Sequence, residues 1–260
     1  MSSFYKDKVV VITGASSGIG AWLAQELSRL GAIVVLLARS KEKLQRIAAL
    51  MQGKHECIVT DITSSEQVFA ATNQIIHTYG QIDILINNAG YGVFESLAEA
   101  SLQTMEQMMD VNYMGTVRCT KAVMPHMLAA KSGHIVNIAS LAGKIGTAKS
   151  SGYCASKHAV LGFTNSLRQE LKGTGIFITA VNPGPVDTPF FDRADPSGNY
   201  ASKMKTHMLQ PDQVGQAVIR AVIQRKMEIN LPFLFGWAAK FIVVFPWISN
   251  KIIYKFLNNK

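Results

Sequence analysis

The sequence predicts an α/β protein built on one doubly wound, mostly parallel sheet of seven strands. The first observation is that seven short runs rich in Val, Ile and Leu alternate with segments of helical length. The second is that several of these runs are apolar throughout rather than at every other position. Continuous apolar runs are typical of parallel strands that helices cover on both faces. The alternation therefore indicates consecutive βαβ units in one sheet.

The elements follow one another in order along the chain. The apolar runs are "KVVVIT", "AIVVLLA", "ECIVTD", "IDILIN", "HIVNIAS", "IFITAVN" and "EINL". They predict strands at 8–13, 32–38, 56–61, 82–87, 134–140, 176–182 and 228–231. The intervening segments predict helices near 19–30, 41–51, 65–79, 101–130, 152–172 and 212–226. The composition does not change until about residue 229, so we expect one domain over 1–231 and a C-terminal appendage over 232–260.

The composition is that of a well-buried globular protein, with 48% hydrophobic and 17% charged residues among 260. The cysteines Cys57, Cys119 and Cys154 form no CxxC pair, which predicts reduced thiols in a cytoplasmic compartment. The six histidines show no metal-binding spacing, and the first residues do not have the pattern of a signal peptide. We therefore expect no metal site and no secretion signal.

The net charge of +9 suggests a nucleic-acid partner, but the distribution of the charge argues against one. Residues 220–260 contain seven basic side chains and one acidic side chain, so most of the excess lies in the last sixth of the chain. That part of the chain is also its most apolar. Because the charge does not form a basic stripe on the main domain, we expect no nucleic-acid partner.

The segment "TGASSGIG" lies between the first predicted strand and the first predicted helix. Gly14 permits a tight turn, while Gly18 and Gly20 let the backbone approach a pyrophosphate and let the helix pack on the sheet. The helix N-terminus then offers free N–H groups and its positive dipole end to the anion. Close packing alone can require such glycines, but the strand before and the helix after favour a bound dinucleotide.

The end of the second predicted strand discriminates between the two nicotinamide dinucleotides. An NAD site usually carries an Asp or Glu here, which binds the ribose 2′-hydroxyl. This chain has Arg39, followed by Ser40 and Lys41, so a cation stands where a 2′-phosphate would lie. We expect NADP(H) in preference to NAD(H); an exposed loop arginine is the alternative. Asp61 either accepts a hydrogen bond from the adenine amino group or caps the helix that begins near Ser64.

Further motifs follow the later strands in a fixed order. They are "NNAG" at 87–90, "MDVNYMG" around Asn112, Ser140, "YCASK" at 153–157 and "NPGPVDT" at 182–188. Together with the glycine-rich turn, they make residues 7–231 resemble the NADP-type branch of the short-chain dehydrogenase/reductase family. The resemblance implies a Rossmann-like fold, a dinucleotide-binding catalytic domain over 1–231, and a homo-oligomer. It also implies an oxidoreductase that transfers a hydride to or from a carbonyl or alcohol.

The resemblance implies a catalytic tetrad of Asn112, Ser140, Tyr153 and Lys157, and each role is physically reasonable. The spacing of Tyr153 and Lys157 stacks them one helical turn apart; by itself it also fits an exposed pair. A nearby positive charge lowers the pKa of a phenol from about 10, so Tyr153 can act as general acid or base. Ser140 would stabilise a developing alkoxide, and Asn112 would hold a water that links Lys157 to solvent.

The remaining cofactor contacts are expected from the same motifs. The "NNAG" turn is expected to pack against the adenosine ribose, with Asn87 tethering neighbouring strands, and the "NPGPVDTP" loop is expected to meet the nicotinamide. The predicted cofactor-binding residues are Gly14, Ser16, Ser17, Gly18, Ile19, Gly20, Arg39, Ser40, Asp61, Ile62, Asn88, Ala89, Gly90, Tyr153, Lys157, Pro183, Gly184, Val186 and Thr188.

The substrate is expected to contact the segments after Ser140 and after Thr188. Phe190 and Phe191 indicate an apolar wall that Phe94 joins, and the 20 or so polar residues that follow indicate a mobile lid. These features favour a lipophilic ketone over a sugar. The alternative is a non-catalytic protein that senses a dinucleotide, for which an intact tetrad would serve no purpose.

The C-terminal segment combines apolar, aromatic and basic residues. Residues 231–248 carry one charge, Lys240, and residues 231–256 hold eight of the 22 aromatic side chains. Pro232, Pro246 and Lys240 disfavour a membrane-spanning helix. Two interpretations stay open, namely peripheral association with an anionic membrane surface and burial against the substrate pocket or a second subunit. We expect a cytoplasmic protein, with peripheral membrane association through the appendage as the open question.

Overall fold

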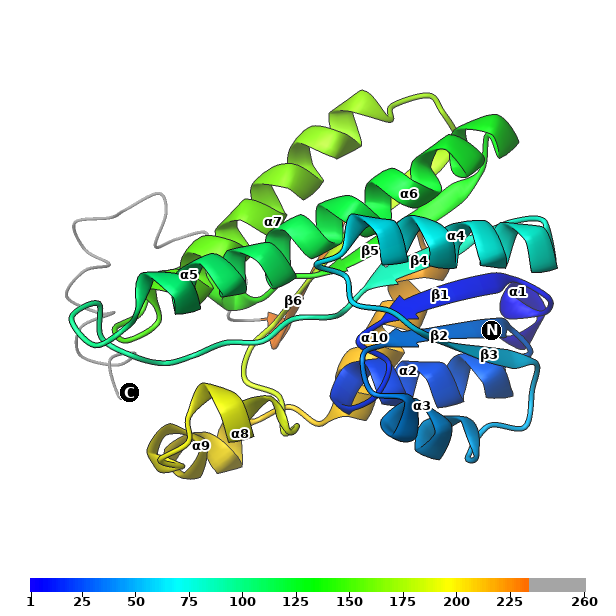
Figure 1. Ribbon diagram of the computed structural model, residues 1–260. Coiled ribbons are helices and arrows are strands. Elements are labelled where there is room, and N and C mark those ends of the chain that lie inside the picture. The colour runs from blue at the N-terminus through cyan, green and yellow to red at the C-terminus, as the bar shows by residue number, and fades with distance from the viewer. Residues whose placement is uncertain (234–260) are drawn as a thin grey trace.

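The computed structural model describes residues 1–233, so the predicted appendage lies outside the described residues except for its first two positions. One sheet contains seven strands in the order β3-β2-β1-β4-β5-β6-β7, and all of its pairings are parallel (Figure 1). The predicted doubly wound sheet is therefore confirmed, and it is parallel throughout. Over residues 1–233, none of the helices is both long enough and apolar enough to cross a bilayer.

The central strands are buried on both faces, which explains their continuous apolar sequences. Only the two edge strands, β3 and β7, are mostly half-buried. In the register, Val11 of β1 lies between Val35 of β2 and Leu85 of β4. The strands are β1 (Val9–Thr13), β2 (Ile33–Ala38), β3 (His55–Val59), β4 (Ile84–Asn87), β5 (Gly133–Ile138), β6 (Ile176–Pro183) and β7 (Glu228–Leu231).

Helices cover the sheet in two layers, as Figure 1 shows. One layer consists of α2 (Gly18–Arg29), α3 (Lys41–Ala48) and α10 (Pro211–Ile223). The other consists of α4 (Ser65–Tyr79), α5 (Leu102–Met109), α6 (Gly115–Ala130) and α7 (Ser151–Glu170). Each layer has its own apolar core against the sheet, because a parallel sheet must bury both faces.

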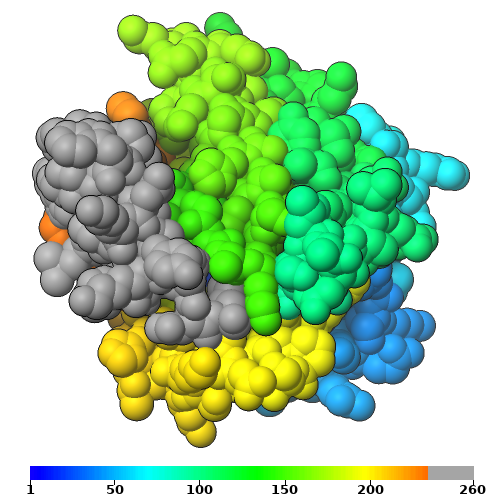
Figure 2. All heavy atoms as spheres, turned by 90° about the vertical axis from the view of Figure 1, so that its left-hand side faces the viewer, coloured from blue at the N-terminus to red at the C-terminus, as the bar shows by residue number. Residues whose placement is uncertain are grey.

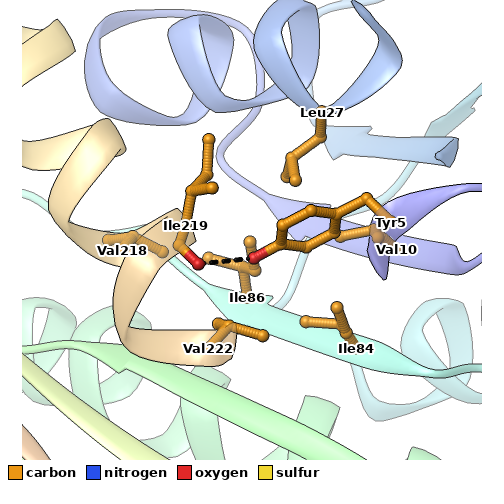
Figure 3. Close-up of a pocket in the computed structure, with 8 residues that line it drawn as sticks. All are labelled: Tyr5, Val10, Leu27, Ile84, Ile86, Val218, Ile219 and Val222. Atoms are coloured by element: carbon orange, nitrogen blue, oxygen red, sulfur yellow. Dashed lines mark hydrogen bonds between the residues drawn. The ribbon is translucent and has the colours of Figure 1, made fainter. Parts of the chain in front are cut away.

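The N-terminal residues add a short helix that the sequence analysis did not predict, α1 (Ser2–Tyr5). Tyr5 is 1% exposed and its hydroxyl donates to the carbonyl of Ile219 at 2.8 Å (Figure 3). The figure shows the ring among apolar side chains of α2, α10 and the sheet. This contact ties the start of the chain to α10.

The helix predicted at 101–130 is interrupted, because a π-helical turn, η1 (Asp110–Met114), separates α5 from α6. Such turns are often found at functional sites, since they redirect one side chain. Here the turn contains Asn112, whose amide bonds to the backbone of a neighbouring loop. Hydrophobic periodicity alone does not distinguish a π turn from a regular helix.

The predicted mobile lid after Thr188 is a structured segment. It contains α8 (Phe190–Ala194), α9 (Asn199–Met204) and a 3-10 turn, η3 (Lys205–His207). The Asp195 carboxylate orders it by accepting hydrogen bonds from the N–H groups of Tyr200 (2.8 Å) and Ala201 (2.9 Å). In Figure 1 this segment lies beyond the carboxyl end of the sheet.

Candidate active site

The candidate site is a cleft at the carboxyl ends of the strands, where the strand order changes direction between β1 and β4. Ligands of doubly wound sheets bind at this switch point. The cleft has a volume of about 1280 Å³, above the roughly 300–1,000 Å³ of ordinary ligand pockets. Figure 2 faces this end of the molecule, and the lid (yellow) forms its lower edge.

The turn between β1 and α2 is shaped for close approach by a ligand. Gly14 has a φ of +65°, which favours glycine. A Cβ at Gly20 would lie 2.5 Å from the Asn88 Nδ2 and 2.5 Å from the Gly14 carbonyl oxygen. Asn88 holds the turn by donating from Nδ2 to the carbonyls of Thr13 (3.0 Å) and Gly14 (3.1 Å). Ser17 begins α2 without a side-chain cap, so the first N–H groups remain available for an anion.

Cations lie along the wall that follows β2. Arg39 and Ser40 line the cleft as predicted, and Lys43 and Arg46 of α3 line it as well. The sequence analysis missed these two, although residues three apart share one side of a helix. Lys41, the remaining basic residue of the segment, is not among the lining residues. Within residues 1–233, none of these cations forms an ion pair.

Asp61 lines the cleft and does not cap α4. The cap is Ser64, whose Oγ accepts a hydrogen bond from the Gln67 N–H at 3.2 Å. Asp61 Oδ1 instead accepts from the N–H (2.9 Å) and the Oγ1 (2.8 Å) of Thr63. The capping interpretation is therefore wrong, and the carboxylate is held at the cleft wall by its own turn.

Asn87 tethers the end of β4, as the sequence suggested. Its Nδ2 donates to Asn137 Oδ1 on β5 at 2.9 Å and to Thr120 Oγ1 on α6 at 3.1 Å. The position of the following turn is therefore set by the sheet and by one helix of the covering layer.

Tyr153 and Lys157 share one face of α7 and line the inner part of the cleft. They are 9% and 5% exposed, so the interpretation as an exposed pair is wrong. The Lys157 Nζ lies 5.9 Å from the centre of the Tyr153 ring and donates to the carbonyl of Ile138 at 2.9 Å. Burial lowers the pKa of Lys157 to about 8, because the ammonium is removed from water.

Ser140 precedes the 3-10 turn η2 (Leu141–Gly143) at the end of β5. Its Oγ accepts from the Ala142 N–H at 3.0 Å and donates to the Pro183 carbonyl at 3.3 Å. Burial raises the pKa of Tyr153 above its ordinary value, and a hydrogen bond with Ser140 offsets part of the rise. Lys157 is not among the causes of this shift, so the expected lowering of the phenol pKa by Lys157 is not found.

Asn112, which is 1% exposed, connects the loop after β4 to α7 beneath the surface of the cleft. Its Oδ1 accepts from the Tyr91 N–H at 2.9 Å, while its Nδ2 donates to the Tyr91 carbonyl (2.8 Å) and to Ser156 Oγ (2.9 Å). A Cβ at Gly90 would lie 3.0 Å from Asn112 Oδ1 and 3.4 Å from Lys157 Nζ, so these two groups are neighbours. The amide thus clamps the loop after β4 to α7.

The loop after β6 closes the cleft opposite the glycine-rich turn. The Gly184 N–H donates to the Leu231 carbonyl at 2.7 Å, so β7 supports this loop. Thr188 lies against the turn, since a Cβ at Gly18 would stand 3.1 Å from its Cγ2. Of the predicted cofactor-binding residues, all line the cleft except Gly20, which lies beneath the turn. Of the predicted tetrad, Ser140, Tyr153 and Lys157 line the cleft and Asn112 does not.

Aromatic rings cover the inner end of the cleft. The ring centre of Phe94 lies 6.1 Å from that of Tyr153, 6.3 Å from that of Phe190 and 6.3 Å from that of Phe191. Phe190 also lies 5.5 Å from Tyr153, and Tyr200 of α9 lies 5.5 Å from Phe94. The structure therefore brings the three predicted phenylalanines together around Tyr153, and the lid adds Tyr200, which the sequence analysis missed.

The model of the family described as short chain dehydrogenase matches residues 8–197 of this chain. This chain belongs to the short-chain dehydrogenase family. It is 39% identical over 230 residues to an uncharacterised oxidoreductase of Staphylococcus saprophyticus, covering 87% of this chain and 95% of the relative. It is 35% identical over 219 residues to an uncharacterised oxidoreductase of Staphylococcus epidermidis, with 84% and 92% covered. The protein is therefore an oxidoreductase enzyme of the short-chain dehydrogenase/reductase type.

Solved short-chain dehydrogenases have the same fold. A short-chain dehydrogenase/reductase from Burkholderia phymatum in complex with NAD superposes with a TM-score of 0.85 and 26% identity, covering 94% of this chain and 96% of that one. An alcohol dehydrogenase from the archaeon Thermococcus sibiricus complexed with 5-hydroxy-NADP gives 0.76 and 27% identity, with 87% and 96% covered. These two neighbours are described in complex with NAD and with 5-hydroxy-NADP.

Proposed function

We propose that this short-chain dehydrogenase reduces a lipophilic ketone to an alcohol and uses NADPH as the hydride donor. The observation that carries the proposal is the buried pair of Tyr153 and Lys157, with Ser140 beside it, at the inner end of a large cleft. The glycine-rich turn supports the cofactor, because Gly14 and Gly18 line the cleft without a side chain and the first N–H groups of α2 carry no side-chain cap. The cations Arg39, Lys43 and Arg46 support a 2′-phosphate on the outer wall.

The proposed chemistry assigns a proton to one named atom. Burial keeps the Tyr153 phenol protonated at neutral pH, so its hydroxyl can donate to a carbonyl oxygen as that oxygen gains charge. The Ser140 hydroxyl, which donates to the Pro183 carbonyl at 3.3 Å in the structure, turns to donate a second hydrogen bond to the same oxygen. Lys157, held by the Ile138 carbonyl, binds the nicotinamide ribose, and Asn112 positions the surrounding loop. NADPH, when bound, supplies the hydride that reaches the carbonyl carbon.

The aromatic wall supports a lipophilic substrate. Phe94, Phe190 and Phe191 offer apolar surface next to the Tyr153 hydroxyl, and they contain few groups that could bind the hydroxyls of a sugar. Phe190, whose ring centre lies 5.5 Å from that of Tyr153, would contact the apolar part of a ketone bound at the phenol. We therefore expect KM to fall as the apolar part of the ketone grows.

The test follows NADPH absorbance with a panel of aliphatic, aromatic, acyl-thioester and steroid ketones. The wild-type enzyme should oxidise NADPH with at least one lipophilic ketone, and Tyr153→Phe should abolish turnover with little change in the Kd of NADPH. Full turnover by Tyr153→Phe would remove Tyr153 from the mechanism. Wild-type protein that binds NADPH but reduces none of the ketones would favour a dinucleotide sensor.

The appendage needs its own experiment, since residues 234–260 lie outside the described residues. We propose that it binds anionic membrane surfaces, on the strength of its aromatic and lysine content. Liposome flotation should carry the full chain upward at low salt and leave a chain ending at Leu231 behind. If both remain at the bottom of the gradient, the appendage serves another purpose.

A further inference from the structure

The lid helix α8 carries a cation that the proposed chemistry does not use. Arg193 stacks on Tyr91, with its Cζ 3.5 Å from the centre of the ring. Such a contact fixes the plane of the guanidinium, which has five N–H donors at its edge. In the part of the chain that the structure describes, no carboxylate forms an ion pair with Arg193.

Both partners of this contact are fixed by backbone hydrogen bonds. Tyr91 is held on both its N–H and its carbonyl by the Asn112 side chain. The lid is held at the next residue, where the Phe94 N–H donates to the Ala194 carbonyl at 2.9 Å. Arg193 therefore has a defined position beside the loop that follows β4.

This position belongs to the same cleft as the cations after β2. Arg193 and Tyr91 line it together with Arg39, Lys43 and Arg46. Burial raises the pKa of Tyr91, whereas Arg193 and Arg39 both act to lower it, so both guanidinium groups lie within electrostatic range of one hydroxyl. The acidic residues among the described lining are Asp61 and Asp192, which leaves positive charge in excess.

Cations on two walls of one cleft repel each other unless an anion lies between them. We propose that Arg193 is a further phosphate-binding residue, which the lid adds to the cofactor site. The inference rests on the proposed binding of NADPH. It assigns Arg193 to the phosphates of the adenosine half, because Tyr91 directly follows the "NNAG" turn that is expected to contact the adenosine ribose.

The helix that carries Arg193 also forms part of the substrate pocket. Phe190 lies on the same short helix as Arg193 and covers the ring of Tyr153. A phosphate that binds Arg193 therefore also holds the apolar wall of the substrate pocket in place. Cofactor binding should precede completion of that pocket.

The experiment titrates NADPH into cofactor-free protein by calorimetry, with no ketone present. Arg193→Gln should raise the Kd about tenfold at low salt, as expected for a lost charged hydrogen bond, and less at high salt. Arg193→Lys, which keeps the charge, should recover part of the affinity. The matched control is Lys205→Gln, which removes one charge from the exposed side of the same lid and should change the Kd less than twofold.

Trypsin provides a second measurement, since Lys203 and Lys205 of the lid are exposed. Saturating NADPH should slow cleavage at these sites in the wild type but not in Arg193→Gln. An unchanged Kd in Arg193→Gln, with faster cleavage in the absence of NADPH, would overturn the inference and leave Arg193 as a lid contact only. If the wild-type protein binds no NADPH, the proposed function is overturned as well. If the wild type and Arg193→Gln bind NADPH with the same Kd, only this inference is overturned.

Discussion

Replacing Lys157 with methionine should make the cofactor-free protein more stable at neutral pH. Lys157 is 5% exposed, and burial lowers its pKa from 10.5 to about 8. A difference of this size means that the charge costs the folded state about 3 kcal/mol at pH 7. The variant loses the hydrogen bond that the charged Lys157 donates to the Ile138 carbonyl, worth roughly 1.5–3 kcal/mol. The expected net gain is therefore between about 0 and 1.5 kcal/mol, with complete loss of turnover.

The pH dependence gives the sharper test. Because the folded pKa lies below the unfolded one, the cost is present in full below about pH 8 and disappears as the pH approaches 10.5. The amount by which Lys157→Met exceeds the wild type in free energy of unfolding, measured in urea, should shrink over this range. The other titratable groups are present in both proteins, so their contributions cancel in the difference. Lys205→Met, at an exposed position, should show a difference that does not change with pH. A constant difference for Lys157→Met would refute burial as the cause of its lowered pKa.

Three further substitutions test separate parts of the structure. Arg39→Asp should raise the Kd of NADPH by roughly 10- to 100-fold and that of NADH much less. Lys41→Asp, at a position that does not line the cleft, is the control. Equal effects on both cofactors would contradict the 2′-phosphate assignment. Gly20→Ala should weaken NADPH binding and destabilise the fold by about 1–3 kcal/mol, since its Cβ would strike the turn, whereas Gly162→Ala has open space and should be harmless. Tyr5→Phe should lower the free energy of unfolding by about 1 kcal/mol, because the enclosed space has no room for a replacement water; an unchanged unfolding curve would mean that the bond contributes nothing.

Most of the fold could be predicted from local sequence patterns. Strands that are covered on both faces must be apolar throughout, so β1, β2 and β4 are visible as runs of Val, Ile and Leu. The glycine-rich turn is equally visible, because a Cβ at Gly14 would stand 2.8 Å from the Ala89 Cα and one at Gly20 would stand 2.5 Å from the Gly14 carbonyl oxygen. The spacing of Tyr153 and Lys157 likewise placed both on one helical face.

Other features depend on contacts between distant segments. The π turn at Asn112 is stabilised by hydrogen bonds to Tyr91, 21 residues earlier, so no pattern within the helix reveals it. The lid takes a defined shape because Asp195 binds the start of α9 and because Phe94 packs on its aromatic rings. From the sequence, its polar composition gave no sign of these helices.

The upward shift of the Tyr153 pKa shows most clearly which properties of the site follow from the sequence and which depend on tertiary packing. From the sequence alone, we predicted that a phenol and an ammonium share one face of a helix. How far each group is removed from water depends on the tertiary packing, and desolvation has the largest effect on the pKa of both groups. Burial favours the neutral form of both groups, so the folded chain holds a protonated phenol at the inner end of its cleft.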